Sequence, residues 1–110
     1  MKTLKFRSYL VPLVLSGEKN STWRLFDDKD LNAGDDVKLL EFVTLRHFAN
    51  AKLTIVIEKP FKDLTPEDKA GHEAFNTDQE MYENYKKYYK TDVGPDTLVK
   101  IMRFELVETF

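Results

Sequence analysis

The feature that constrains the fold of this chain most strongly is its series of strand-like segments. Turns and only short helical segments join them. Alternation of polar and apolar residues marks the first and last of them, residues 2–7 and 98–107, because a period of two is typical of a half-buried strand. Strands are also expected over 22–26, 36–43 and 51–58. A parallel βαβ arrangement would need longer helices between successive strands. The sequence therefore predicts a small α+β fold with a twisted sheet or a partly closed barrel.

Turn and capping residues mark where the helices begin and end. Gly17 is expected to end a helix over 9–16, because glycine readily adopts the left-handed conformation after a helix C-terminus. Thr65-Pro66 is typical of a helix start, and residues 77–80 carry a capping-box pattern that opens a helix to about Tyr89. The predicted order of elements is β-α-β-β-β-α-α-β. The strand over 51–58 is expected to place three apolar side chains on one face: Leu53, Ile55 and Ile57.

Length and composition set the broad class. The 110 residues suffice for one domain, expected to span 1–110 and to bury a single core. No apolar run approaches the roughly 18 residues needed to cross a bilayer, and the charged, alternating N-terminus is typical of a strand and not of a signal peptide. The absence of cysteine excludes disulfides and zinc–thiolate sites. It also fits our expectation of a cytoplasmic protein without a membrane partner.

Charge is distributed unevenly along the sequence. The net charge of −2 argues against a general nucleic-acid binder held by phosphate contacts. Residues 1–24 nevertheless carry five cations against a single glutamate. We expect a localised anion-attracting site if these side chains converge in space. The alternative is that they are spread along a solvated strand edge.

The octapeptide 17–24, Gly-Glu-Lys-Asn-Ser-Thr-Trp-Arg, concentrates polar chemistry between core-forming segments. In a strand, Thr22 and Arg24 point to one face and Trp23 points to the other, toward the core. A bend just before Thr22 would bring Lys19 to its hydroxyl. Burial and a nearby arginine both lower the pKa of a lysine, and such an amine can take the proton of a hydroxyl nucleophile. The alternative is that Lys19 and Arg24 are surface charges and that Thr22 only packs in a strand.

The same residues resemble a known family. The pattern Gly-x-Lys-x-x-Thr-x-Arg after a short helix, followed by the turn Ala33-Gly34-Asp35 into a strand, is similar to that of the ASCH domain. The apolar strand 51–57, the helix start at 64–67 and the closing strand 99–106 extend the resemblance over nearly the whole chain. ASCH domains are related to the PUA-like β-barrels and are associated with RNA. The resemblance implies a small, PUA-like, mostly antiparallel β-barrel with short flanking helices.

The resemblance also implies an activity. Threonine at position 22 is the version found in the small bacterial ASCH enzymes that hydrolyse N4-acetylcytidine to cytidine and acetate. It implies Thr22 as the nucleophile and Lys19 as the proton acceptor. The implied proton donor is Glu73, with Glu67 as the competing candidate. The implied substrate-binding residues are Gly17, Ser21, Arg7 and Arg24, the last holding an anionic or carbonyl oxygen. No cofactor and no metal are implied.

A second function class stays open, a non-catalytic RNA-binding module that uses the same basic cleft. In that case Lys19 and Arg24 grip phosphate, aromatic side chains stack on bases, and binding weakens steeply as salt rises. The basic groove would then continue over Lys2, Lys5 and Arg7. The enzyme instead predicts a concave, partly buried pocket sized for one nucleoside.

Histidine and aromatic residues are the remaining candidates for a functional role. His47 and His72 have no second ligand at metal spacing, so they are expected at the surface or in hydrogen bonds, with no metal site. The tyrosines of the helix opened at residue 77, with Met81, are expected mostly in the core, although an exposed one among the lysines would be able to stack on a base. Five phenylalanines are expected inside: Phe6, Phe42, Phe48, Phe61 and Phe104.

Overall fold

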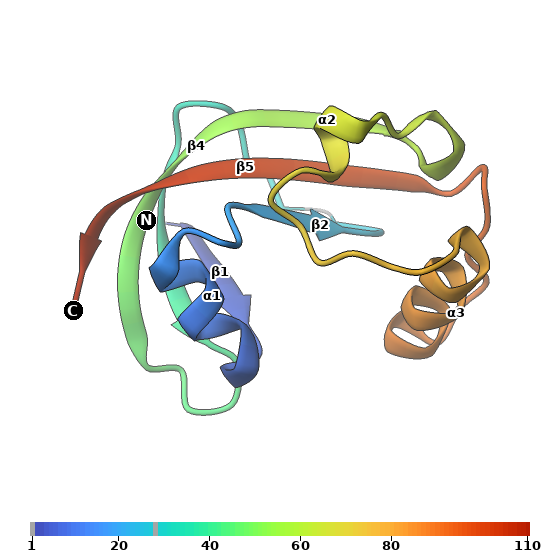
Figure 1. Cartoon of the computed structure of the whole chain (residues 1–110). Coiled ribbons are helices and arrows are strands. Elements are labelled where there is room, and N and C mark those ends of the chain that lie inside the picture. Colours follow the sequence, from blue (N-terminus) through green and yellow to red (C-terminus); the bar gives the residue numbers. More distant parts are fainter. Residues whose placement is uncertain (1, 28) are drawn as a thin grey trace.

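Five strands form one curled sheet in the computed structural model, which describes residues 2–27 and 29–110 (Figure 1). The elements in chain order are β1 (Lys2–Phe6), the 3-10 helix η1 (Ser8–Leu10), α1 (Val11–Ser16), β2 (Ser21–Arg24), β3 (Asp36–Glu41), β4 (His47–Pro60), the 3-10 helix η2 (Phe61–Asp63), α2 (Pro66–Lys69), α3 (Asp78–Tyr89) and β5 (Leu98–Thr109). This confirms the predicted order β-α-β-β-β-α-α-β. The two 3-10 helices were not predicted.

The strand order in the sheet is β1-β3-β4-β5-β2. β1 and β3 pair in parallel, while β3–β4, β4–β5 and β5–β2 pair antiparallel. The sheet curls into a half-barrel whose edge strands are β1 and β2. A side chain bridges these two edges, because Arg24 Nη2 donates a hydrogen bond of 2.8 Å to the carbonyl of Lys5. The predicted small, mostly antiparallel α+β architecture with short flanking helices is confirmed.

The paired strands β4 and β5 are longer than predicted. β4 already begins at His47, before the expected start at residue 51, and runs through Pro60. The prediction that Ile55 and Ile57 share a face with Leu53 is wrong, since Leu53 is fully buried whereas the isoleucines are 44% and 37% exposed. The register of β4 on β5 shifts between Leu53 and Ile55. Such a bulge inserts one extra residue and reverses the alternation beyond it.

Two clusters of buried side chains replace the single core that was expected. The first core joins α1 to the sheet and consists of Leu4, Phe6, Leu10, Val11, Val14, Leu31, Val37, Leu39, Phe48, Ala49, Ala51, Leu53, Met102 and Phe104. The second core joins α3 to the sheet and consists of Trp23, Leu25, Phe61, Met81, Tyr85, Val93, Val99 and Ile101. The adjacent residues Ile101 and Met102 of β5 belong to different cores, because neighbouring side chains of a strand point to opposite faces.

Helix capping and aromatic burial differ from the prediction in detail. The complete capping box lies at the start of α2, between Thr65 and Asp68. At the start of α3 the Thr77 hydroxyl accepts from the amide of Glu80, but the Glu80 carboxylate accepts from Asn76. The prediction that five phenylalanines are buried is wrong for one of them, because Phe42 is 43% exposed. In the part of the chain that the structure describes, no helix is long and apolar enough to cross a membrane.

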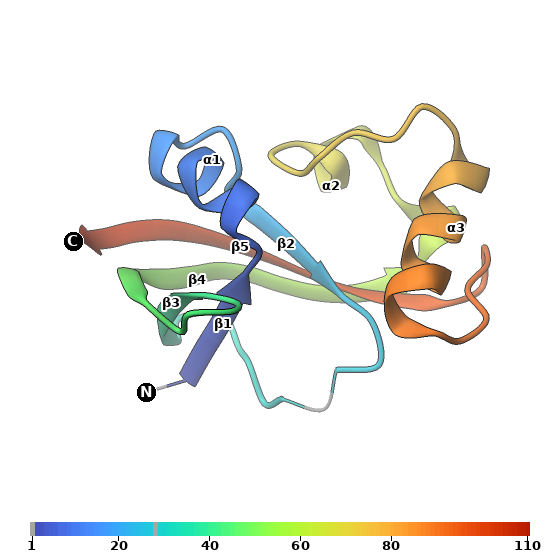
Figure 2. The same cartoon turned by 90° about the horizontal axis from the view of Figure 1, so that it is seen from below.

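The arrangement of the helices leaves β2 in the middle of the molecule. α1 lies near one end of the sheet and α3 near the other, and the chain between α2 and α3 passes beside β2 (Figures 1 and 2). The octapeptide that ends in β2 therefore lies between the two helices and faces the loop that follows α2.

Candidate functional site

A glycine fixes the loop after α2 against the start of β2. The carbonyl of Gly71 accepts hydrogen bonds from the amides of Asn20 and Ser21, at 3.1 and 3.2 Å. Gly71 has φ +77°, and a Cβ there would lie 1.9 Å from Asn20 Oδ1. Any other residue would strain the backbone and displace the Asn20 side chain. The two residues after Gly71, His72 and Glu73, are thereby held beside β2.

A second turn directs Lys19 inward. Gly17 ends α1 in the left-handed conformation, with φ 86°, and the amide of Lys19 then donates to the carbonyl of Leu13 at 3.0 Å. The Lys19 side chain is only 4% exposed. Its Nζ donates to the carbonyl of Ser21 at 2.8 Å and lies 2.5 Å from Glu73 Oε2. The bend expected before Thr22 therefore exists, and it brings a buried ammonium onto a carboxylate from the loop after α2.

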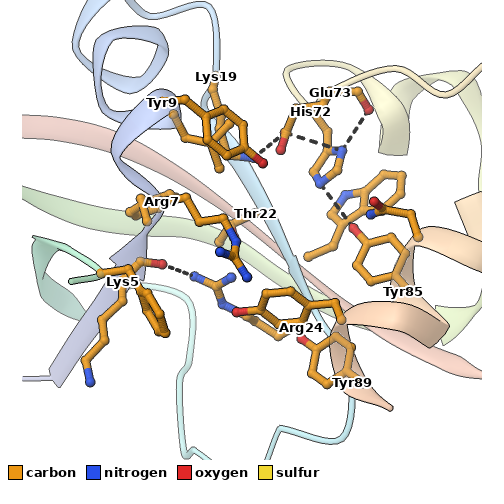
Figure 3. Close-up of a pocket in the computed structure, with 16 residues that line it drawn as sticks. Lys5, Arg7, Tyr9, Lys19, Thr22, Arg24, His72, Glu73, Tyr85 and Tyr89 are labelled. Atoms are coloured by element: carbon orange, nitrogen blue, oxygen red, sulfur yellow. Dashed lines mark hydrogen bonds and ion pairs between the residues drawn. The ribbon is translucent and has the colours of Figure 1, made fainter. Parts of the chain in front are cut away.

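Lys19, Thr22 and Glu73 line one cleft (Figure 3). The cleft encloses about 100 Å³ and opens to solvent. Thr22 is 2% exposed, so its side chain lies in the cleft wall. Among the described residues, the Lys19 ammonium donates to the Ser21 carbonyl and to Glu73 and not to the Thr22 hydroxyl. The ammonium and the hydroxyl thus share a cavity without a direct hydrogen bond.

The electrostatics of this pair follow from burial. Burial lowers the pKa of the Lys19 ammonium, Glu73 opposes the shift, and the charge of Arg24 adds to it. Burial alone would raise the pKa of the Glu73 carboxyl, but His72 and the hydrogen bond from Lys19 outweigh it and lower that pKa. The resting pair is therefore an ammonium–carboxylate ion pair in which the ammonium is less stable than on an exposed lysine.

His72 belongs to the site, which the sequence reasoning missed. Its ring stacks on Trp23 with a centroid distance of 3.8 Å and an interplanar angle of 12°. Nδ1 lies 2.9 Å from the backbone carbonyl of Glu73, and Nε2 lies 3.4 Å from the Tyr85 hydroxyl. Burial is the main cause that lowers the pKa of His72 to about 4, so the ring is neutral at pH 7. Nδ1–H then donates to the carbonyl, and Nε2 accepts from Tyr85.

Cations and aromatic rings surround the mouth of the cleft. The guanidinium carbon of Arg7 lies 4.9 Å from the centroid of the Tyr88 ring and 5.6 Å from that of Phe42. Of the five cations in residues 1–24, four line the cleft: Lys5, Arg7, Lys19 and Arg24. The condition set above for an anion-attracting site, that these side chains converge, is therefore met by these four. The fifth, Lys2, instead forms an ion pair with Asp35 at 3.0 Å.

Comparisons with known proteins identify the fold. A protein of Enterococcus faecalis from the family DUF984 aligns over 93% of this chain and 72% of its own, with a TM-score of 0.77 and 22% identity. The ASCH domain of Lactobacillus crispatus aligns over 97% of this chain and 80% of its own, with a TM-score of 0.74 and 12% identity. An ASCH protein of Zymomonas mobilis aligns over 94% and 65%, with a TM-score of 0.63 and 14% identity. The chain has the ASCH fold.

Comparison of the sequence alone does not identify this ASCH fold. No protein-family model matches the sequence, and no curated protein matches it either. The structural similarity therefore identifies the fold. The chemistry of the cleft has to be inferred from the residues that line the cleft.

In this ASCH fold the remaining sequence-predicted residues lie outside the cleft lining. Gly17 acts through the turn after α1. Ser21 is fully buried with no hydrogen-bond partner for its hydroxyl among the described residues, and its carbonyl binds Lys19. The carbonyl of Glu67 accepts from Arg103, and Glu67 does not line the cleft. Of the two carboxylates considered, Glu73 is the one in contact with Lys19. No group of three metal-ligating side chains exists in residues 2–27 and 29–110.

Proposed function

We propose that the cleft hydrolyses the acyl amide of an N-acylated pyrimidine nucleoside such as N4-acetylcytidine. The observation that supports this proposal is a buried amine 2.5 Å from a carboxyl oxygen, with a threonine hydroxyl in the same cleft. Hydrolysis of an amide requires a nucleophile, a base for its proton and an acid for the leaving amine. Thr22, Lys19 and Glu73 supply one group of each kind.

The short contact between Lys19 and Glu73 supplies the reactive protonation state. An ammonium beside a carboxylate differs from a neutral amine beside a carboxylic acid only in the position of one proton. A substrate that covers the cleft excludes water, which disfavours the charged form of both groups. In the neutral form, Lys19 is a base and Glu73 is an acid, with no change in the total charge of the site.

The first half-reaction is acyl transfer to threonine. Lys19 Nζ turns from the Ser21 carbonyl and takes the proton of the Thr22 hydroxyl as Oγ1 bonds to the amide carbon. The carbon–nitrogen bond then breaks, and the leaving nitrogen takes the proton of the Glu73 carboxyl. The products are an acyl ester on Thr22, the free amine of the base, an ammonium and a carboxylate. Arg24 is proposed to hold the acyl oxygen while it carries negative charge.

The second half-reaction restores the protein. Water attacks the ester carbon and gives a proton to the Glu73 carboxylate. The carbon–oxygen bond to Thr22 breaks, and the Lys19 ammonium returns a proton to Oγ1. Acetic acid leaves and ionises in solution, and the neutral amine and carboxylic acid are regenerated.

The test is incubation of the protein with N4-acetylcytidine, with cytidine and acetate measured by chromatography. We expect turnover that falls by at least about 1,000-fold in Thr22→Val, because the nucleophile is removed while the shape of the side chain is kept. The matched control is Thr54→Val, since Thr54 is an exposed threonine of β4 outside the cleft. Absence of turnover in the wild-type protein would contradict the proposal, as would full turnover in Thr22→Val.

A non-catalytic RNA-binding role is the second candidate. It is favoured by exposed tyrosines at a cationic mouth, Tyr9 at 68% and Tyr88 at 47% exposed, because such rings can stack on bases. Short single-stranded RNA that binds with a steep loss of affinity as salt rises, together with no turnover of acetylated nucleoside, would support this role over the enzyme.

A further inference from the structure

The mouth of the cleft carries more positive charge than its own residues neutralise. The charged residues that line the cleft are four cations and a single carboxylate, on a chain whose net charge is −2. That carboxylate, Glu73, is already committed to Lys19. Among the described residues, Lys5, Arg7 and Arg24 form no ion pair. Like charges gathered without a counter-charge favour the binding of an anion.

The guanidinium of Arg7 is held in a form suited to an oxyanion. Its carbon lies over two aromatic rings, those of Tyr88 and Phe42, both within the range of cation–π contacts. These contacts use the faces of the rings and no N–H group of Arg7, and among the described residues the Arg7 guanidinium donates no hydrogen bond, so its N–H groups are free. A planar fork of free donors matches two oxygens of one phosphate.

The position of Arg7 relates it to the proposed reaction centre. Figure 3 shows the Arg7 and Arg24 side chains reaching the cleft from different elements, the segment after β1 and strand β2, while Lys19 contacts Glu73 of the loop after α2 at another side of the cleft. A nucleoside whose acylated base faces Lys19 and Glu73 would direct its sugar toward the side of the cleft that holds Arg7. The group that reaches Arg7 is then the one attached to the sugar.

We propose that Arg7 forms a phosphate subsite, so that the cleft binds a phosphorylated nucleoside more tightly than the free nucleoside. This inference rests on the proposed function, because it assumes that a pyrimidine nucleoside occupies the cleft. The phosphate is either the 5′-monophosphate of a free nucleotide or a diester of an RNA strand, and both present the same oxygens to Arg7.

The test separates phosphate binding from turnover. The affinities of cytidine and cytidine 5′-monophosphate are measured by calorimetry at low salt on the wild-type protein, on Arg7→Gln and on Arg46→Gln. Arg46 is the matched control, an exposed arginine outside the cleft lining. We expect the monophosphate to bind at least about tenfold tighter than cytidine, as for a charge-assisted hydrogen bond. We expect this preference to be lost in Arg7→Gln and kept in Arg46→Gln.

The other possible results decide between the phosphate subsite and its alternatives. Equal affinity for cytidine and its monophosphate overturns the proposal, as does an equal loss of the preference in both variants. Thermal unfolding of Arg7→Gln checks that this exposed substitution leaves the fold intact. Monophosphate binding that depends on Arg7, with no turnover of N4-acetylcytidine, supports the phosphate subsite while the proposed hydrolysis fails. A cytidine dinucleotide identifies the source, since tighter binding than the monophosphate indicates an RNA strand and weaker binding indicates a free nucleotide.

Discussion

Lys19 is the residue on which the proposed chemistry of the cleft depends. A buried ammonium is stable only when it is paired and hydrogen-bonded, and Glu73 and the Ser21 carbonyl provide both partners. Apolar side chains of similar volume would stabilise the fold at least as well. A half-buried ion pair, with Lys19 buried and Glu73 partly exposed in the wall of an open cleft, is therefore better explained by function than by stability.

His72 makes stability depend on pH. Its pKa is about 4 in the folded protein against an ordinary value of 6.5, so between these values the unfolded chain binds a proton that the folded protein does not. The free energy of unfolding therefore falls as the pH drops from 6.5 toward 4, by up to about 3 kcal/mol. Urea unfolding of the wild-type protein at a series of pH values measures this slope.

The variant His72→Phe isolates the effect. Phenylalanine keeps an aromatic ring on Trp23 but has no titratable group, so we expect a less stable protein whose free energy of unfolding changes much less across the same pH range. An identical pH dependence in the wild-type protein and in the variant would show that another group is responsible.

Residues close together in the sequence were predicted better than residues joined by the fold. Lys19, Thr22 and Arg24 lie within one octapeptide, and local turn chemistry indicated the bend that brings them to one cleft, although Lys19 contacts Glu73 and not the Thr22 hydroxyl. Glu73 was named through the resemblance and not through spacing, because its contact with Lys19 spans 54 residues. His72 was expected at the surface or in hydrogen bonds, and it is hydrogen-bonded, but the sequence reasoning did not connect it with the cleft. Its position between Gly71 and the candidate acid was the available signal.

At the scale of elements, the contact between β2 and the loop after α2 assembles the site. Gly71→Ala is expected to lower the free energy of unfolding by about 1–2 kcal/mol, since alanine at φ +77° is strained and Asn20 must move. We also expect turnover to fall by about tenfold or more, because Glu73 is displaced from Lys19. Urea unfolding and the acetate assay measure the two effects.

Gly34→Ala is the control for backbone strain. Gly34 also has a positive φ, +93°, but a Cβ there meets nothing within 4 Å. We expect a similar loss of stability with turnover unchanged. Equal turnover in the two variants would mean that the loop after α2 does not position the acid.

Element order followed from sequence patterns, whereas strand register did not. Gly17, Thr65-Pro66 and Thr77 mark helix ends through local backbone chemistry, and these boundaries hold to within a residue or two. The shift beyond Leu53 and the shift between Leu39 and Leu40 depend on how partner strands fit. A period of two carries no information on such an insertion. Ile55 and Ile57 were assigned to the wrong face for this reason.

At the scale of the whole molecule, the two cores flank the site and share strand β5. Ile101 belongs to one core and Met102 to the other, so loss of either core removes support from β5. We expect one cooperative unfolding transition. Trp23, the single tryptophan, reports on the second core by fluorescence, and far-UV circular dichroism reports on the sheet. Their urea midpoints should coincide, and an earlier fluorescence transition would show that the second core unfolds on its own.

The most direct test of the proposed chemistry is the location of the acyl group during the reaction. The wild-type protein is mixed with N4-acetylcytidine, quenched in acid on the time scale of one turnover and analysed by peptide mass spectrometry. We expect the acetyl group on Thr22, as an ester that disappears as acetate is released. Release of acetate with no acetyl group ever found on Thr22 would contradict the account.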